Sequence, residues 1–122
     1  MKVMIVDDSN SIVMVVGQML TETGHESVRA KDGQHAVELL GSGEKVDIIL
    51  LDWNMPNMSG IEFLKYNFEK NIANCPIVMM TTENKPEKIR EALQYGASEY
   101  IMKPFTKDIL LSKIQTVLDF LA

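Results

Sequence analysis

Short apolar runs alternate five times with longer segments in which apolar residues recur at helical spacing. Turn-forming or polar residues bound the short runs, as is typical of strands, and capping residues, proline or glycine bound the longer segments. The predicted strands are residues 2–6, 26–30, 46–51, 77–80 and 99–102, and the predicted helices are 9–23, a segment capped by Asp32, a segment capped by Ser59, about 86–96, and 106–121. The chain is therefore expected to be an α/β protein of five strand–helix units.

Strand–helix alternation at this spacing indicates right-handed βαβ units and a parallel sheet with helices on both faces. The run 46–51 is apolar enough to be buried on both faces, whereas 26–30 is more polar and is typical of an edge strand. We predict a flavodoxin-like (βα)5 fold, a doubly wound five-stranded parallel sheet in the order 2-1-3-4-5. Residues 1–122 are expected to form a single domain without an effector domain.

Polar side chains follow four of the predicted strands. Asp7 and Asp8 follow the first, Asp52 the third, Thr81 the fourth and Lys103 the fifth. Because ligands of open α/β sheets bind at the carboxyl ends of the strands, we expect these groups to meet at one edge. Three carboxylates, a hydroxyl and an ammonium there describe a site for a divalent cation and a phosphoryl group.

A hard oxygen site with few protein ligands suits Mg²⁺. We expect Asp8, Asp52 and the backbone carbonyl of Asn54 to be direct ligands, and Asp7 to act through water. Lys103 and Thr81 would bind the phosphoryl oxygens, and Asp52 would become an aspartyl phosphate. Each residue also has an ordinary structural explanation, such as a helix cap or a turn former, so the hypothesis depends on the combination.

Composition places the chain among ordinary globular domains, with 46% hydrophobic and 24% charged residues in 122. The net charge of −5 and the scattered lysines and arginines argue against nucleic acid as a partner. No apolar stretch approaches the roughly 18 residues of a membrane span. The only cysteine, Cys75, excludes an internal disulfide and is expected to be a packed thiol. We expect a cytoplasmic protein.

Four motifs together resemble the receiver domain of bacterial two-component response regulators, over essentially the whole chain. They are VDD at 6–8, LDWNMPNMSG at 51–60, MTTE at 80–83 and YIMKPF at 100–105. The second motif and the expected lack of an effector domain look most like stand-alone chemotaxis regulators of this family. The chain departs from the family pattern in an unusually apolar first helix, 10–16, which core packing or a docking patch for a kinase or phosphotransfer helix would explain, and in Thr82, where many relatives have a smaller residue.

The resemblance implies that Asp52 receives its phosphoryl group from a histidine kinase or phosphotransfer domain. It also implies that Thr81 and Tyr100 form a switch, and that Asn54 and Glu83 flank a hydrolytic water and tune dephosphorylation. The expected partner surface comprises Lys85, Ile89, Leu93, Tyr100, Met102 and Lys113. The family likeness further implies a monomer that catalyses only its own phosphorylation and dephosphorylation, with a downstream protein target such as a flagellar motor switch.

Other functions remain open on the sequence alone. The chain could be a phosphorelay intermediate or a phosphate sink in another pathway. An aspartate-nucleophile phosphatase of the haloacid dehalogenase type would need a second Asp where Asn54 stands. A flavodoxin-like electron carrier would need phosphate donors where Asp7 and Asp8 stand. A structural adaptor would not need the complete set of acids and lysine.

Overall fold

The structure, a computed structural model, describes residues 1–121 apart from the side chain of Leu121. Ala122, which closes the predicted domain 1–122, lies outside the described residues. Strands and helices alternate along the chain as the sequence predicts. They are β1 (Lys2–Val6), α1 (Asn10–Glu22), β2 (Glu26–Ala30), α2 (Gly33–Gly41), β3 (Ile48–Leu51), α3 (Gly60–Lys70), β4 (Ile77–Thr81), α4 (Pro86–Gln94), β5 (Glu99–Met102) and α5 (Lys107–Leu121).

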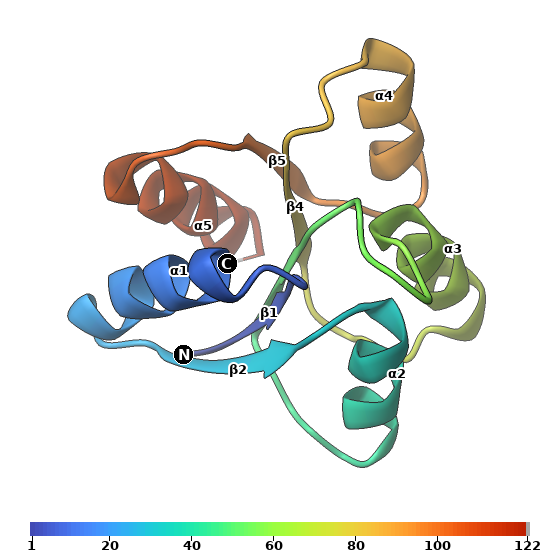
Figure 1. Ribbon diagram of the computed structural model, residues 1–122, viewed down its shortest axis with the longest axis horizontal. Coiled ribbons are helices and arrows are strands. Elements are labelled where there is room, and N and C mark those ends of the chain that lie inside the picture. Colours follow the sequence, from blue (N-terminus) through green and yellow to red (C-terminus); the bar gives the residue numbers. More distant parts are fainter. Residues whose placement is uncertain (122) are drawn as a thin grey trace.

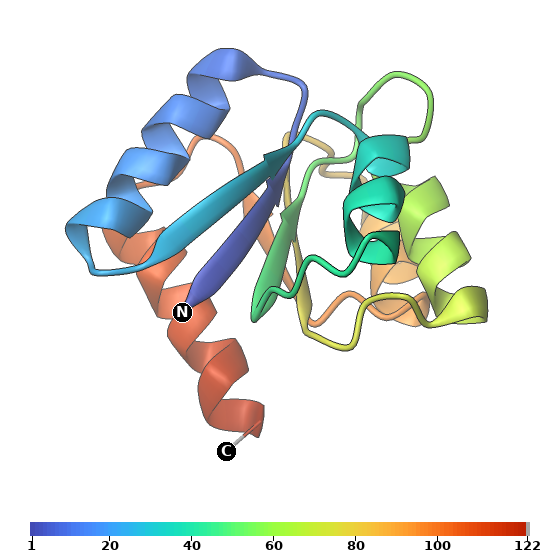
Figure 2. The same cartoon turned by 90° about the horizontal axis from the view of Figure 1, so that it is seen from below.

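The five strands form one parallel sheet in the order β2-β1-β3-β4-β5, which confirms the predicted topology. Helices α1 and α5 cover one face, and α2, α3 and α4 cover the other (Figures 1 and 2). The order reverses between β1 and β3, so the loops that follow these two strands lie side by side. In doubly wound sheets such a point is where ligands bind.

Successive strand residues enter two separate cores, because side chains of a strand alternate between the faces of the sheet. In β1, Val3 and Ile5 pack against α1 and α5, whereas Met4 and Val6 pack on the side of α2 and α3. The strands β3 and β4 divide their residues in the same way, and all of these side chains are buried. Burial on both faces explains why the central strands read as continuous apolar runs.

Two predicted strand boundaries are wrong. Residues 46 and 47 were expected in a strand, but β3 begins at Ile48. The Asp47 backbone N–H donates to the Lys2 carbonyl at 2.8 Å, and its carboxylate accepts from the Lys2 N–H at 2.7 Å, so this segment is fastened beside β1 without forming a ladder. The strand β4 extends to Thr81, one residue beyond its predicted end, because Thr81 still pairs with Met102 of β5.

Each helix follows the carboxyl end of a strand after a loop, and polar caps fix most of the first turns. Ser9 accepts from the Ile12 N–H, and Asp32 accepts from the His35 N–H. Ser59 and Glu62 form a reciprocal capping box at the start of α3. Ser9 and Thr106, which were predicted as helical, are instead residues that precede the helices and accept from their first turns. No helix of the described residues is long and apolar enough to cross a membrane.

Candidate functional site

Three carboxylates converge at the carboxyl edge of the sheet. Val6 and Leu51 are partners in the adjacent strands β1 and β3, so the residues that follow them emerge side by side. One carboxylate oxygen each from Asp7, Asp8 and Asp52 lies within 4.8 Å of the others. Asp7 and Asp52 are buried, whereas Asp8 is exposed at the rim.

The donor set of this cluster fits Mg²⁺. Its ligand atoms are all carboxylate oxygens, which hard divalent cations prefer, and one of the three acids faces solvent. Mg²⁺ usually keeps several of its waters, so a small cluster that is open on one side suits it. The predicted association of Asp7, Asp8 and Asp52 is therefore present in the structure.

Lys103, the residue that follows β5, brings a positive charge to the same cluster. Its Nζ atom lies 2.7 Å from Asp7 Oδ2 and 3.5 Å from Asp52 Oδ1, and only 12% of its side chain is exposed. The Lys103 backbone N–H donates to the Thr81 carbonyl at 2.9 Å, which holds the start of this segment against β4. The ammonium can therefore reach any group that is seated against Asp52.

Burial and a neighbouring acid oppose the ionisation of Asp52. Loss of water around the carboxylate raises its pKa above the ordinary value, and the charge of Asp7 raises it further. The Lys103 ammonium, the Trp53 backbone N–H and the Thr81 hydroxyl act in the other direction. The Trp53 N–H donates to Asp52 Oδ1 at 2.8 Å and orients the side chain. The ionised carboxylate is thus held in surroundings that an added cation would make more favourable.

The close approach of α3 fixes the backbone at Asp52. Gly60, the first residue of α3, donates its N–H to the Trp53 carbonyl at 2.8 Å. A Cβ atom at Gly60 would overlap the carbonyl oxygen of Asp52, so glycine is the residue that fits there. Sequence reasoning missed this role, although a glycine directly after a capping serine in the conspicuous motif 51–60 was a signal for it.

A side-chain hydrogen bond joins the loop after Asp52 to the residue that caps α2. The Asn57 side chain, whose backbone has a φ of 65°, donates to Asp32 Oδ2 at 2.8 Å. Asp32 also caps α2 through the His35 N–H, and these hydrogen bonds lower the pKa of its carboxyl group. This contact was not predicted, because the sequence does not reveal which side chains of neighbouring loops meet.

Thr81 and Tyr100 both bind the same turn. The buried Thr81 hydroxyl accepts from the Glu83 N–H at 3.2 Å, and the Tyr100 hydroxyl donates to the Glu83 carbonyl at 2.7 Å. Tyr100 is half-buried, and burial, together with the charges of Glu83 and Asp52, raises its pKa to about 12. The two residues predicted to form a switch are therefore linked through Glu83.

The remaining predicted residues lie around this site. Asn54 is exposed two residues after Asp52, and Glu83 is half-buried two residues after Thr81. The predicted partner surface runs over α4, β5 and α5: Leu93 and Met102 are 46% and 38% exposed, Lys85 is exposed, and Ile89, Tyr100 and Lys113 are half-buried. Lys113 pairs with Glu99 of β5 at 3.4 Å.

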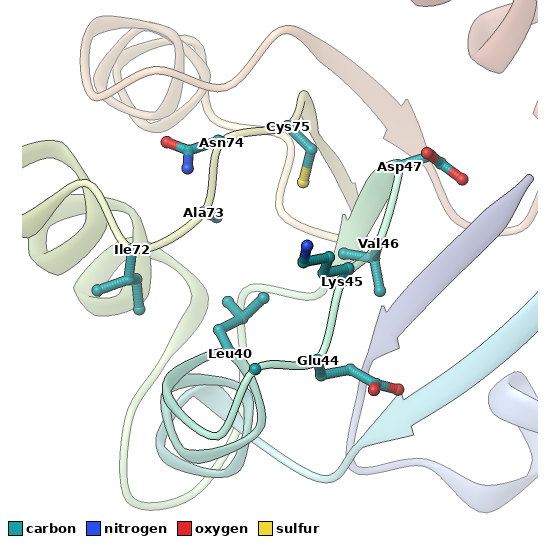
Figure 3. A pocket seen from close by; sticks show the side chains of 10 residues that line it. Leu40, Glu44, Lys45, Val46, Asp47, Ile72, Ala73, Asn74 and Cys75 are labelled. Carbon is teal, nitrogen blue, oxygen red and sulfur yellow. The ribbon is translucent and has the colours of Figure 1, made fainter.

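A separate hollow of about 450 Å³ lies at the opposite, amino-terminal end of the sheet (Figure 3). The side chains of Lys45 and Cys75 point into it, whereas Asp47 points away (Figure 3). Cys75 is half-buried, and burial raises the pKa of its thiol to about 11, so it is the packed, unreactive thiol that was expected. The candidate chemistry thus lies at the carboxyl edge.

Comparisons with known proteins agree with this arrangement. The family model described as the response regulator receiver domain matches residues 3–115. A chemotaxis protein CheY homolog of Campylobacter jejuni is 40% identical over 120 residues, covering 97% of this chain and 92% of that protein. Chemotaxis protein CheY of Pseudomonas aeruginosa is 36% identical over 121 residues, covering 98% and 97%.

Solved structures share the fold over almost the whole chain. Vibrio cholerae chemotaxis protein CheY4 has a TM-score of 0.86 and 39% identity, covering 95% of this chain and 97% of that one. The receiver domain of Francisella response regulator 1452 has a TM-score of 0.89 and 30% identity, covering 99% and 98%. These likenesses confirm the resemblance that was drawn from the four sequence motifs.

Proposed function

The chain belongs to the response regulator receiver domain family, and from that premise we propose that it is a stand-alone phosphoacceptor switch of two-component signalling in chemotaxis. The observation that carries the proposal is the environment of Asp52. This carboxylate lies beside Asp7 and Asp8, and the Lys103 ammonium is 3.5 Å from one of its oxygens. The length of the relatives supports a switch built from this domain alone, since the chain covers 92% and 97% of the two chemotaxis proteins described above.

Asp52 is the proposed acceptor. One of its carboxylate oxygens attacks the phosphorus of a phosphohistidine on a kinase or phosphotransfer domain, the new O–P bond forms, and the N–P bond to the histidine breaks. Lys103 neutralises charge on the transferred oxygens, and Thr81 supplies a hydroxyl donor. Such a site contributes mainly position and electrostatics, because phosphoryl transfer needs little covalent chemistry from the protein.

Asp8, Asp52 and the Asn54 carbonyl are the proposed direct ligands of Mg²⁺. When bound, the cation would screen the charge between Asp52 and the incoming phosphoryl group. Asp7 is proposed to act through water, and its contacts support this: Oδ2 pairs with Lys103 at 2.7 Å, and Oδ1 accepts from the Ser9 N–H at 2.9 Å. Both oxygens of Asp7 are therefore engaged by the protein.

The turn at Glu83 is the proposed bistable element. A phosphoryl group on Asp52 offers the Thr81 hydroxyl a charged acceptor, which competes with its present contact to the Glu83 N–H. Movement of this turn would withdraw the Glu83 carbonyl from the Tyr100 hydroxyl and let the ring change position. The surface of α4, β5 and α5 would then alter its affinity for a downstream protein, for which a flagellar motor switch is the candidate.

Asn54 and Glu83 are proposed to tune the lifetime of the phosphorylated form. Asn54 is exposed and Glu83 half-buried, so both can meet a water that approaches Asp52. We expect fast self-dephosphorylation, slowed by Asn54→Ala. Loss of the phosphoryl group from purified protein, followed over time by mass spectrometry, measures it, and a wild-type lifetime of many hours would contradict the proposal.

The decisive experiment is modification by a small phosphodonor. Incubation with acetyl phosphate and Mg²⁺ should add one phosphoryl group, detected by intact-protein mass spectrometry, and Asp52→Asn should abolish it. Asp47→Asn is a matched control, since Asp47 is an exposed acid that directly precedes the same strand, at the edge of the sheet away from Asp52. Modification of the Asp52→Asn variant would refute the assignment.

The output surface needs its own test. Beryllofluoride, which mimics the phosphoryl group, should change the amide chemical shifts of α4, β5 and α5 when it is added with Mg²⁺. It should also increase capture of the downstream protein by the immobilised chain. Shift changes confined to α1 would place the output surface elsewhere.

A further inference from the structure

The loop between β1 and α1 carries two of the three acids, but it holds them differently. Asp7 is buried, and its carboxylate contacts Lys103 and the Ser9 N–H. Asp8 is exposed at the rim of the site. The position of an exposed carboxylate depends on the backbone that presents it, so the rigidity of residues 7–10 bears directly on the metal site.

Arg29 of the edge strand β2 reaches this loop from the side. Arg29 pairs with Ile5 in the sheet, and Ile5 packs on the face that α1 covers, so the arginine points toward the start of α1. Its Nη2 donates to the Asp7 carbonyl at 3.2 Å, and its Nη1 donates to Asn10 Oδ1 at 2.6 Å. These two acceptors stand on either side of Asp8 and Ser9.

We propose that Arg29 is a positioning residue of the magnesium site, because its guanidinium clamps both ends of the loop that presents Asp8. The planar fork of an arginine suits this task, since it offers several donors in fixed directions. The Nε atom is buried and has no hydrogen-bond partner, whereas the Nη1 contact with Asn10 is exposed and the Nη2 contact with Asp7 is partly buried. Groups that orient metal ligands from outside typically change metal affinity by about 10- to 100-fold.

Arg29 also places a positive charge near an acidic cluster. The charge and the clamp are expected to change Mg²⁺ affinity in opposite directions. If charge dominated, removing Arg29 would make the site more negative and strengthen Mg²⁺ binding. If the clamp dominates, removing it frees the loop and weakens binding. We infer that the clamp dominates, because both contacts are charge-assisted hydrogen bonds to the loop itself.

Calorimetric titration with Mg²⁺ tests the inference without any phosphorylation step. Arg29→Met, which removes both the fork and the charge, and Arg29→Lys, which keeps only the charge, should each raise the dissociation constant about tenfold or more. Lys31→Met is the matched control, because it removes an exposed charge just beyond the same strand. It should leave the affinity unchanged or slightly stronger.

Asn10→Ala keeps the test decisive if the arginine variants fold poorly. Asn10 is exposed in the first turn of α1, where alanine is tolerated, so the variant loses one clamp contact and little else. It should weaken Mg²⁺ binding in the same direction but less, and the double variant with Arg29→Met should be less than additive. Thermal unfolding without Mg²⁺ shows which variants are folded.

This inference rests on the proposed function, and the two can fail separately. A wild-type protein that shows no Mg²⁺ binding overturns both the proposed metal site and the clamp. A wild-type protein that binds Mg²⁺, together with folded Arg29 variants that bind it equally well or more tightly, overturns only the clamp. Weaker binding by Arg29→Met alone, with Arg29→Lys unaffected, also overturns it, because a lysine, which lacks the planar fork, would then hold the loop equally well.

Discussion

Lys103 and Asp7 form an ion pair of 2.7 Å between the ends of β5 and β1, across the two strands that separate them in the sheet. Asp7 is fully buried, and only 12% of the Lys103 side chain is exposed. A buried pair of this kind is costly to break, because the remaining charge loses its partner. The contact therefore joins the end of β1 to the residue that follows β5 and holds the Lys103 ammonium beside Asp52.

Lys103→Met tests this arrangement. We expect the free energy of unfolding to fall by about 3 kcal/mol, since Asp7 is left buried without its cation. Phosphorylation by acetyl phosphate should slow by at least about tenfold, because a donor to the transferred oxygens is lost. Mg²⁺ affinity should not fall, because a competing positive charge has been removed. Urea unfolding, stopped-flow kinetics and calorimetry measure these three quantities.

Lys107→Met is the control for Lys103→Met. Lys107 pairs with Glu22 at 3.1 Å, but both side chains are more than two-fifths exposed. Exposed pairs contribute about 1 kcal/mol or less, so this variant should differ little from wild type in stability and in phosphorylation rate. A similar loss of stability in the two variants would show that the Lys103–Asp7 pair has no special role.

Asp52→Asn should stabilise the protein at neutral pH. The pKa of Asp52 is raised in the fold by burial and by Asp7, so the folded state binds its proton more tightly than the unfolded state does. The resulting stabilisation is present below the unfolded pKa of about 3.9, and it is lost as the pH rises through the folded pKa. Ionised Asp52 therefore destabilises the fold at about pH 7, where asparagine should raise the free energy of unfolding.

The pH dependence distinguishes this cause from a change in packing. In urea unfolding without Mg²⁺, the advantage of Asp52→Asn should shrink toward zero at about pH 3, where wild-type Asp52 is protonated in both states. Mg²⁺ should stabilise wild type more than the variant, since one ligand has lost its charge. A wild type that is more stable than the variant at neutral pH would show that ionised Asp52 does not destabilise the fold.

Much of the fold could be predicted because the sheet is buried on both faces. Alternate residues of β1 enter two cores, so the strand is apolar throughout, and the order of strands and helices follows from this pattern. The start of β3 could not be placed in this way. Val46 and Asp47 continue the pattern of the run, but contacts between Asp47 and Lys2, which are distant in sequence, replace the ladder there.

The candidate site, like the fold, could be predicted only in part. That Asp7, Asp52, Thr81 and Lys103 lie near one another could be predicted, because each stands at a predicted strand end and parallel strands bring their ends to one edge. The clamp by Arg29 could not be found, because it depends on the face of an edge strand and on the direction of a long side chain. Sequence spacing predicts which backbones meet, whereas contacts between side chains also require their rotamers.

Gly60→Ala should destabilise the protein strongly. Its Cβ atom would overlap the Asp52 carbonyl oxygen, and a backbone carbonyl cannot move aside as a flexible side chain can. We expect a loss of more than about 2 kcal/mol in the free energy of unfolding, together with weaker Mg²⁺ binding, because the backbone at Asp52 must shift.

Gly41→Ala is the matched control for Gly60→Ala. Gly41 ends α2, and a Cβ atom there meets nothing within 4 Å, so alanine should be neutral or stabilise the helix by up to about 1 kcal/mol. Urea unfolding measures the free energy of unfolding of both variants, one with a Cβ atom that meets backbone and one with a Cβ atom in open space. Equal stability would mean that the loop after Asp52 adapts without cost.

Tyr100→Phe should loosen the turn that links Thr81 to the partner surface. The variant removes the hydroxyl that donates to the Glu83 carbonyl at 2.7 Å, and a lost hydrogen bond of this kind costs about 1 kcal/mol. Amide hydrogen exchange should therefore become faster across residues 82–86, while Asp52 remains able to accept a phosphoryl group. Because the hydroxyl stabilises the present arrangement of the turn, its loss should also shift the equilibrium toward the activated surface and increase binding of the downstream protein without phosphorylation. Unchanged exchange in this turn would show that the tyrosine does not hold it, and the proposed route from Asp52 to the surface would have to exclude Tyr100.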